Sequence, residues 1–427
     1  MGLSDNLMHK AKANKVGILS LGCPRNLVDS QNLLGCLSRK GYQIVDIQDA
    51  EIGLVNTCSF IEEAKKESIE AILGLIDLKK EGRLRKVIVA GCLVQRYKEE
   101  LLPNLEEIDA FVGRMALSNE NKESFPLTPR HFAYLKISEG CNHTCSFCVI
   151  PKIKGHLQSR RMESILEEVR IMDNVGKREI NIIGQDASAY GLDIYKKLEL
   201  SRLLRKISAS LKNVRWLRLL YLHPQHLTDG LMRLIADEPR ICKYVDLPLQ
   251  HINNRILKTM RRRTDKRKIM QLLAGLRKRI PGVAVRTSLL VGFPGETEKE
   301  FSELLSFVKE QQFERLGVFR YSREEGTPAF SYPGQVPEKL KEERFNIIMQ
   351  EQQEISRRLN QKFLGRECEV LIDERSTDGT YLGRLSIDAP EVDGLVYVKT
   401  AKHLEPGAFV RLKITDTYEY DLVGNVI

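Results

Sequence analysis

The sequence has no apolar run long enough to cross a membrane and no segment typical of a secretory signal. Its longest apolar runs, such as Ser288–Phe293, are far shorter than the about 20 residues of a membrane-spanning helix. The first 15 residues, MGLSDNLMHKAKANK, lack the apolar stretch of a signal peptide. These absences predict a cytoplasmic protein with no membrane partner.

The sequence also lacks the even, closely spaced cysteines of a disulfide framework. Nine cysteines, an odd number, are spread over 427 residues. In a reducing compartment, grouped cysteines more often bind metal or take part in redox chemistry. There is no tandem repeat and no low-complexity stretch, and the length predicts two or three domains.

Residues 15–127 are predicted to form an α/β domain with a parallel sheet. Three short apolar runs, Val16–Cys23, Ile52–Cys58 and Lys86–Cys92, alternate with helical stretches such as Glu62–Lys80. Because this alternation is typical of βαβ units, the three runs are expected to be neighbouring parallel strands.

Residues 128–362 are predicted to form a partial (β/α)6 barrel and a connecting helix. Six strand-like segments are each followed by a helix-like stretch, and six repeats suit a partial barrel better than a closed eight-stranded one. The strand candidates are Phe132–Ser138, Glu179–Gly184, Trp216–Leu222, Tyr244–Leu249, Ala284–Gly292 and Arg315–Tyr321. In such a barrel, the carboxyl ends of the strands carry the chemistry.

Residues 363–427 change to a period of two, with turn signals between short apolar runs. This pattern predicts a small antiparallel β-barrel of OB type. The fold class is therefore α/β, with a β-barrel at the C-terminal end.

One cysteine group follows directly on the first strand of the central barrel. Cys141, Cys145 and Cys148 are spaced C-x3-C-x2-C, so three thiolates in one loop can hold three irons of a [4Fe–4S] cluster. The fourth iron is then free to bind a small molecule. A zinc site would need a fourth ligand, and His143 would make it cramped.

A second group is spread over the first domain. Cys23, Cys58 and Cys92 each end a strand candidate and are 35 and 34 residues apart. Carboxyl ends of parallel strands meet at one edge of a sheet, so three thiols would converge there. Buried structural cysteines are the alternative for any single one, but three equivalent positions favour a second cluster. Cys36, Cys242 and Cys368 are interpreted as packing residues.

Other turns at strand ends are candidates for ligand contacts. Gly292–Glu296 (GFPGE) ends one strand and is followed by Thr297–Glu300, which resembles a capping box. The Gly184–Gln185 turn ends another strand. The basic run Arg261–Lys268 is interpreted as a solvated face, with RNA contact as the alternative. His251, at the end of the fourth strand, is a weak candidate for the catalytic face, because a lone histidine is more often structural.

Together these residues resemble the radical S-adenosylmethionine methylthiotransferase family, over nearly the whole chain from Lys15 onward. The motifs are the three cysteines of the first domain, the CNHTCSFC loop and a terminal TRAM-like barrel. The amino-acid sequences of three segments are similar to those of the family branch that modifies a ribosomal protein: Ser20–Ser30, Asn56–Ser68 and Arg218–Pro224. Gln31, where that branch often has Glu, departs from its pattern.

The resemblance implies two [4Fe–4S] clusters and S-adenosylmethionine. The Cys141 loop would bind S-adenosylmethionine at its open iron, and the first-domain cluster would carry the sulfur that is transferred. An external electron donor and a monomeric enzyme are also expected. The residues implied to line the S-adenosylmethionine pocket are Phe147, Gly184, Gln185, Gly292, Phe293 and Gly295.

The implied substrate is an aspartate of small-subunit ribosomal protein twelve, methylthiolated at its β-carbon. The net charge of +10 suggests a polyanionic partner such as RNA or a ribosome. Residues 365–427, however, contain 12 Asp/Glu and 7 Lys/Arg, a net of −5. An acidic terminal barrel is expected to suit a basic ribosomal protein better than RNA.

Two alternatives remain open at this stage. The first is a tRNA methylthiotransferase with the same clusters, which would act on an adenosine. The second is a zinc-bearing protein that binds RNA or the ribosome without catalysis. Colour would separate the second from an iron–sulfur enzyme, because iron–sulfur proteins are brown.

Overall fold

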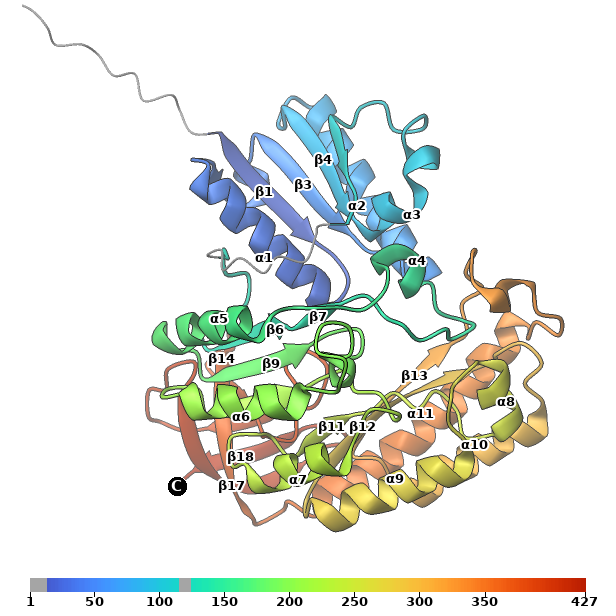
Figure 1. Ribbon diagram of the computed structural model, residues 1–427. Coiled ribbons are helices and arrows are strands. Elements are labelled where there is room, and N and C mark those ends of the chain that lie inside the picture. The colour runs from blue at the N-terminus through green and yellow to red at the C-terminus, as the bar shows by residue number, and fades with distance from the viewer. Residues whose placement is uncertain (1–13, 115–123) are drawn as a thin grey trace, which may run out of the picture. The chain divides into compact units, whose positions relative to one another are not determined.

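The computed structural model describes residues 14–114 and 124–427. The described residues form two compact units, one holding 14–114 and 124–127 and the other 128–427 (Figure 1). Among these residues, no helix combines the length and the apolar character needed to span a membrane.

The first unit is built on a five-stranded parallel sheet in the order β2-β1-β3-β4-β5. The strands are β1 (Lys15–Ser20), β2 (Gln43–Ile44), β3 (Ile52–Thr57), β4 (Lys86–Gly91) and β5 (Ala110–Val112). The helices are α1 (Pro24–Arg39), α2 (Glu62–Lys80) and α3 (Cys92–Leu101). Every residue of β3 is buried, as expected for a central strand covered on both faces.

The second unit begins with six parallel strands that form two three-stranded sheets, β10-β9-β6 and β11-β12-β13. A bridge between Leu217 and Ile241 continues the curvature from one sheet to the other. The strands are β6 (Phe132–Lys136), β9 (Glu179–Ile183), β10 (Trp216–Leu219), β11 (Tyr244–Asp246), β12 (Ala284–Val291) and β13 (Arg315–Arg320). The predicted partial (β/α)6 barrel is thereby confirmed.

Amphipathic helices lie outside these strands and bury their apolar faces against them (Figure 1). They are α5 (Met162–Asn174), α6 (Leu200–Ser210), α7 (Asp229–Asp237), α8 (Asn254–Thr259), α9 (Lys266–Arg279), α10 (Glu298–Gln311) and α11 (Glu338–Gln361). The capping box expected at the start of α10 is present: Thr297 and Glu300 each bond the other's backbone N–H.

The terminal barrel is closed and small, with the strand order β14-β15-β16-β18-β17. Its strands are β14 (Glu367–Arg375), β15 (Tyr381–Arg384), β16 (Val396–Lys399), β17 (Phe409–Thr417) and β18 (Leu422–Val426). All pairs are antiparallel except β16 with β18, which run parallel. The sequence pattern predicts the strands but not this one parallel pair.

Residues 386–393, part of the segment that joins β15 to β16, lie against the amino end of the six-stranded barrel. They bond side chains from the first three residues of β6, β10, β11, β12 and β13. The pairs are Tyr134–Glu391, Arg218–Ser386, Tyr244–Asp393, Arg286–Asp393 and Arg315–Asp388. The terminal barrel therefore packs against the amino end of the central barrel, and the two barrels form one compact unit.

A buried network of ion pairs joins the terminal barrel to the central barrel. Glu179 lies between Arg218 and Arg384, at 2.8 and 2.7 Å from their nitrogens, and all three side chains are almost fully buried. Arg384 also holds Asp373 at 2.7 Å, and His131 bonds the same carboxylate. Burial opposes ionisation of Glu179, but the two arginines outweigh it and hold its pKa below the usual value.

Candidate active site

The loop that carries Cys141, Cys145 and Cys148 lies at the carboxyl end of β6. It is closed by a two-residue antiparallel ladder between β7 (Ser138–Glu139) and β8 (Gln158–Ser159), and it leads into α4 (Ile150–Lys154). All three cysteines are partly exposed. The thiols are therefore at the end of the barrel where such folds place their chemistry.

Gly140 makes the tight start of this loop possible. Its φ is +73°, and a Cβ there would lie 2.1 Å from the carbonyl oxygen of His156. The backbone N–H of Cys141 then donates to the carbonyl of Gly155 at 3.1 Å. Only glycine fits both the left-handed backbone and the close approach.

The thiol of Cys141 is set in a polar, half-buried environment. Its sulfur accepts the backbone N–H of His143 at 3.4 Å. Burial raises the pKa of Cys141 to about 11, with Asp186 and Cys145 adding to the rise. Deprotonating this thiol therefore requires a strong local positive charge, such as that of a metal ion.

Arg262 turns away from solvent toward this loop. It is buried, whereas Arg261, Arg263 and Arg267 beside it are exposed. Its Nη1 lies 3.7 Å from the sulfur of Cys145, and its Nη2 donates to the carbonyl oxygen of Pro248 at 2.6 Å. The basic run predicted to be a solvated face is thus solvated at most positions but places one arginine in the site.

A cluster of imidazoles and one carboxylate stands next to the cysteine loop. Asp186, after β9, accepts His143 Nε2 at 2.8 Å and His226 Nδ1 at 2.7 Å on the same oxygen. His223, after β10, stacks on His143 with ring centroids 3.8 Å apart. The Gly184–Gln185 turn beside Asp186 was expected at this end of the barrel, but the sequence did not predict that the three histidines would meet, since they lie up to 83 residues apart.

The Gly184–Gln185 turn lies against the strand that leads into the cysteine loop. Gln185 Nε2 donates to Glu139 at 3.2 Å, and Lys136 and Lys154 donate to the same carboxylate at 2.7 and 3.1 Å. Burial opposes the ionisation of Glu139, but the two lysines outweigh it and lower its pKa to about 2. A Cβ on Gly184 would lie 2.6 Å from the hydroxyl oxygen of Ser138 in β7.

Phe147, within the cysteine loop, packs against an apolar cluster centred on Phe293. Phe293 is fully buried and makes edge contacts with Tyr321 and Tyr332, at 5.5 and 6.3 Å between ring centroids. The GFPGE turn therefore reaches the cysteine loop through this cluster.

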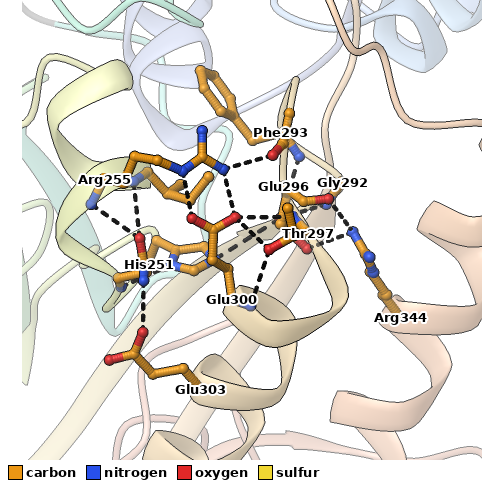
Figure 2. Close-up of polar contacts among 12 residues, drawn as sticks. His251, Arg255, Gly292, Phe293, Glu296, Thr297, Glu300, Glu303 and Arg344 are labelled. Carbon is orange, nitrogen blue, oxygen red and sulfur yellow. Dashed lines mark hydrogen bonds and ion pairs between the residues drawn. The ribbon is translucent and has the colours of Figure 1, made fainter.

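Glu296 organises the GFPGE turn from inside (Figure 2). Its carboxylate accepts the backbone N–H groups of Gly292 and Phe293 at 2.9 and 3.3 Å, and it meets Arg344 of α11 at 2.9 Å. Burial raises the pKa of Glu296 to about 7 against the pull of Arg344. Gly295 donates to the carbonyl of Gly334 at 2.7 Å, so both glycines of the turn serve its backbone geometry.

In the first unit, Cys23, Cys58 and Cys92 follow β1, β3 and β4, which are adjacent and parallel. They therefore lie along one edge of that sheet. Cys23 caps the N-terminus of α1 and Cys92 is the first residue of α3, where the helix favours negative charge. A Cβ on Gly22 would lie 2.7 Å from the Cβ of Cys58, so the first two cysteine positions approach closely.

Arg25 adds a positive charge at this edge. Its Nε lies 3.5 Å from the sulfur of Cys23. Burial works against the thiolate of Cys23, but Arg25 outweighs it and lowers the pKa of this thiol. The edge is therefore suited to hold a thiolate even before a metal is considered.

Three family models match the chain. Residues 135–308 match the radical SAM superfamily, residues 15–113 match an uncharacterized protein family, UPF0004, and residues 364–427 match the TRAM domain. The fold and the three-cysteine loop define a radical S-adenosylmethionine enzyme.

Curated relatives narrow the class. The chain is 47% identical to "Ribosomal protein uS12 methylthiotransferase RimO" of Geobacter sulfurreducens, over 98% of this chain and 100% of the relative. It is 43% identical to the protein of the same name from Clostridioides difficile, over 97% and 99%. The chain belongs to the ribosomal protein uS12 methylthiotransferase family, and it is an enzyme.

Among solved structures, the chain is similar to the radical S-adenosylmethionine methyltransferase TsrM from Kitasatospora setae, with cobalamin and a [4Fe-4S] cluster bound. The TM-score is 0.53 at 14% identity, covering 74% of this chain and 77% of that one. The cobalamin-dependent radical enzyme OxsB gives 0.51 at 11% identity, covering 79% and 56%. These likenesses concern the fold alone.

Proposed function

We propose that this enzyme adds a methylthio group to the β-carbon of an aspartate in ribosomal protein uS12, in the cytoplasm. The observation that carries the proposal is the cysteine loop at the carboxyl end of a six-stranded barrel, in a chain that its curated uS12-modifying relatives match end to end. We further propose that it acts as a monomer with an external electron donor.

Cys141, Cys145 and Cys148 are proposed to hold a [4Fe–4S] cluster. The donor set fits, because three partly exposed thiols share one loop and Arg262 stands beside Cys145 to balance negative charge. When bound, such a cluster supplies the electron that cleaves S-adenosylmethionine. Gly140 and the β7–β8 ladder fix the two ends of the loop at the carboxyl end of the barrel.

Cys23, Cys58 and Cys92 are proposed to hold a second [4Fe–4S] cluster, which carries the sulfur to be transferred. Their shared sheet edge, the two helix N-termini and Arg25 all favour thiolates there. As in the first group, three protein ligands would leave one iron open.

The S-adenosylmethionine pocket is proposed to include Gly184 and Gln185, which lie against the strand leading into the cysteine loop. Phe147 is proposed to pack near the adenine. Gly292, Phe293 and Gly295 are proposed to form the wall behind Phe147, since Phe293 centres the cluster on which Phe147 packs.

The acidic net charge of the terminal barrel is weaker support for a protein substrate than the residue count alone suggests. Several of its acidic side chains are engaged within the unit, among them Asp373, Asp388, Glu391 and Asp393. The choice of uS12 therefore depends mainly on family membership. The tRNA alternative is not favoured, because the relatives described above are named for uS12.

The test uses the full-length enzyme, purified and reconstituted without oxygen. We expect about eight irons per chain and a mass increase on uS12 but none on tRNA. Replacing Cys141, Cys145 and Cys148 with Ala should leave about four irons and abolish S-adenosylmethionine cleavage. An unchanged iron content after replacing Cys23, Cys58 and Cys92 with Ala would refute the second cluster, and modification of tRNA alone would refute the substrate.

A further inference from the structure

The contacts around Asp186 orient the imidazole ring of His143 and leave no oxygen of the carboxylate without a partner. One oxygen of Asp186 accepts both His143 and His226, and the other accepts Ser188 and the backbone N–H of Ala189. The carboxylate is thus satisfied on both oxygens. Its role is to position His143, which stacks on His223 with 18° between the rings.

His223 presents one fixed hydrogen-bond donor. Its Nδ1 accepts the backbone N–H of Gln225 at 3.3 Å, and burial lowers its pKa to about 2, so the ring is neutral. A neutral imidazole that accepts on Nδ1 carries its proton on Nε2. In the part of the chain that the structure describes, nothing accepts this Nε2–H, although the side chain is only 7% exposed.

Arg262 presents a second donor next to the cysteine loop. Its Nη2 and Nη1 are directed at Pro248 and Cys145, but its Nε–H has no acceptor among the described residues. Its side chain is 8% exposed. His223 stacks on His143, and Arg262 reaches Cys145 two residues further along the chain, so both groups adjoin the same loop.

Two buried donors without an acceptor, both beside the cysteine loop, favour an acceptor supplied by a bound molecule, because an unpaired buried donor is costly. A metal ion does not suit His223, since it needs the Nε2 lone pair. The proton would then have to move to Nδ1, where it would face the N–H of Gln225. A fixed N–H beside an arginine is instead suited to an anionic oxygen, above all a carboxylate.

We propose that His223 Nε2 and Arg262 Nε form a subsite that binds the side-chain carboxylate of the substrate aspartate. This inference rests on the proposed function. The β-carbon of an aspartate is bonded directly to that carboxylate, so holding the carboxylate places the reacting carbon beside the cysteine loop. His143, His226 and Asp186 are positioning residues, since they act by holding the ring of His223.

The test measures binding rather than turnover. The cluster-loaded enzyme is titrated without oxygen with recombinant uS12 and with uS12 in which the modified aspartate is asparagine. We expect the native enzyme to bind the aspartate form about tenfold to a hundredfold more tightly, because a charge-assisted hydrogen bond is lost with asparagine. His223→Gln and Arg262→Lys should remove most of this preference.

His251→Gln is the matched control. His251 is also buried, also accepts a backbone N–H on Nδ1, from Asn253 at 3.0 Å, and its Nε2 also has no hydrogen-bond partner among the described residues, but it faces a carboxylate, that of Glu296, at 3.9 Å. This variant should keep the preference for aspartate. S-adenosylmethionine binding and iron content are measured for each variant.

Three results would overturn the proposal: a native enzyme that binds both uS12 forms equally, a His223→Gln variant that keeps the preference, or a His223→Gln variant that loses S-adenosylmethionine binding instead. The asparagine form tests the subsite without altering the enzyme, so a variant that folds poorly does not decide the outcome. Failure of the proposed function appears separately, as the absence of added mass on native uS12.

Discussion

Arg384 is predicted to be the most sensitive single point in the attachment of the terminal barrel. Its guanidinium bonds Asp373 at 2.7 and 2.9 Å, Glu179 at 2.7 Å and the carbonyl of Asp388 at 3.2 Å, and it is 99% buried. In Arg384→Met, Glu179 would keep only Arg218 as a partner and Asp373 only His131. Removing one partner of a buried ion pair costs about 3–5 kcal/mol.

That cost converts into a measurable shift. In a unit of this size, each kcal/mol lowers the melting temperature by about 2–4 °C, so Arg384→Met should lower the transition of the second unit by about 6–20 °C. Differential scanning calorimetry of the full-length protein measures this. Arg366→Met is the control, since Arg366 is exposed on the same barrel and should change stability by less than about 0.5 kcal/mol.

A double variant tests the electrostatic cause. Asp373→Asn in the Arg384→Met background restores the charge balance and leaves Glu179 paired with Arg218. The double variant should be more stable than the sum of the two single effects by about 1–3 kcal/mol. The reasoning fails if Arg384→Met behaves like Arg366→Met, or if the two effects simply add.

Three further predictions follow from other contacts. Arg344→Met should cost about 3–5 kcal/mol at pH 8, where Glu296 is ionised, and Glu296→Gln in that background should recover part of it in thermal unfolding. Gly22→Ala should press on Cys58 and lower the iron content from about eight to about four, whereas Gly82→Ala, at a similar φ in open space, should not. Because folding lowers the pKa of Glu179, its ion pairs stabilise fully above about pH 4.5 and less as the pH falls further. Glu179→Gln should therefore flatten the fall in melting temperature between about pH 5 and pH 3.

Each of these three has a result that would contradict it. For Arg344, it is a double variant no more stable than Arg344→Met alone. For Gly22, it is an iron content equal to that of Gly82→Ala. For Glu179, it is an equal acid sensitivity in the native protein and in Glu179→Gln.

The sequence predicts the strands and the cysteine groups because both are local signals. Apolar runs of strand length alternate with helical stretches, and α2 occupies the predicted Glu62–Lys80. Parallel strands then bring cysteines at equivalent positions to one edge without further information. The short edge strands β2 and β5 were not predicted, since two or three residues carry too little periodicity to be recognised.

Buried charges were not predictable, because their partners lie far along the chain. Arg384 and Glu179 are 205 residues apart, and each has the sequence surroundings of an ordinary strand residue. Arg262 sits in a basic run whose other members face solvent, so nothing local distinguishes the one that turns inward. The His223 donor likewise depends on a backbone contact and a stacked ring that no spacing rule predicts.

The two ends of the central barrel have opposite roles in the second unit. Residues 386–393 lie at its amino end, where their acidic side chains bond an arginine and tyrosines of the barrel strands. Its carboxyl end carries the cysteine loop, Arg262 and the Asp186 cluster. We therefore expect a protein side chain to approach the cysteines of this loop from the carboxyl end. The unpartnered donors of His223 and Arg262 lie at that end, His223 against His143 and Arg262 against Cys145, as a carboxylate arriving from there would require.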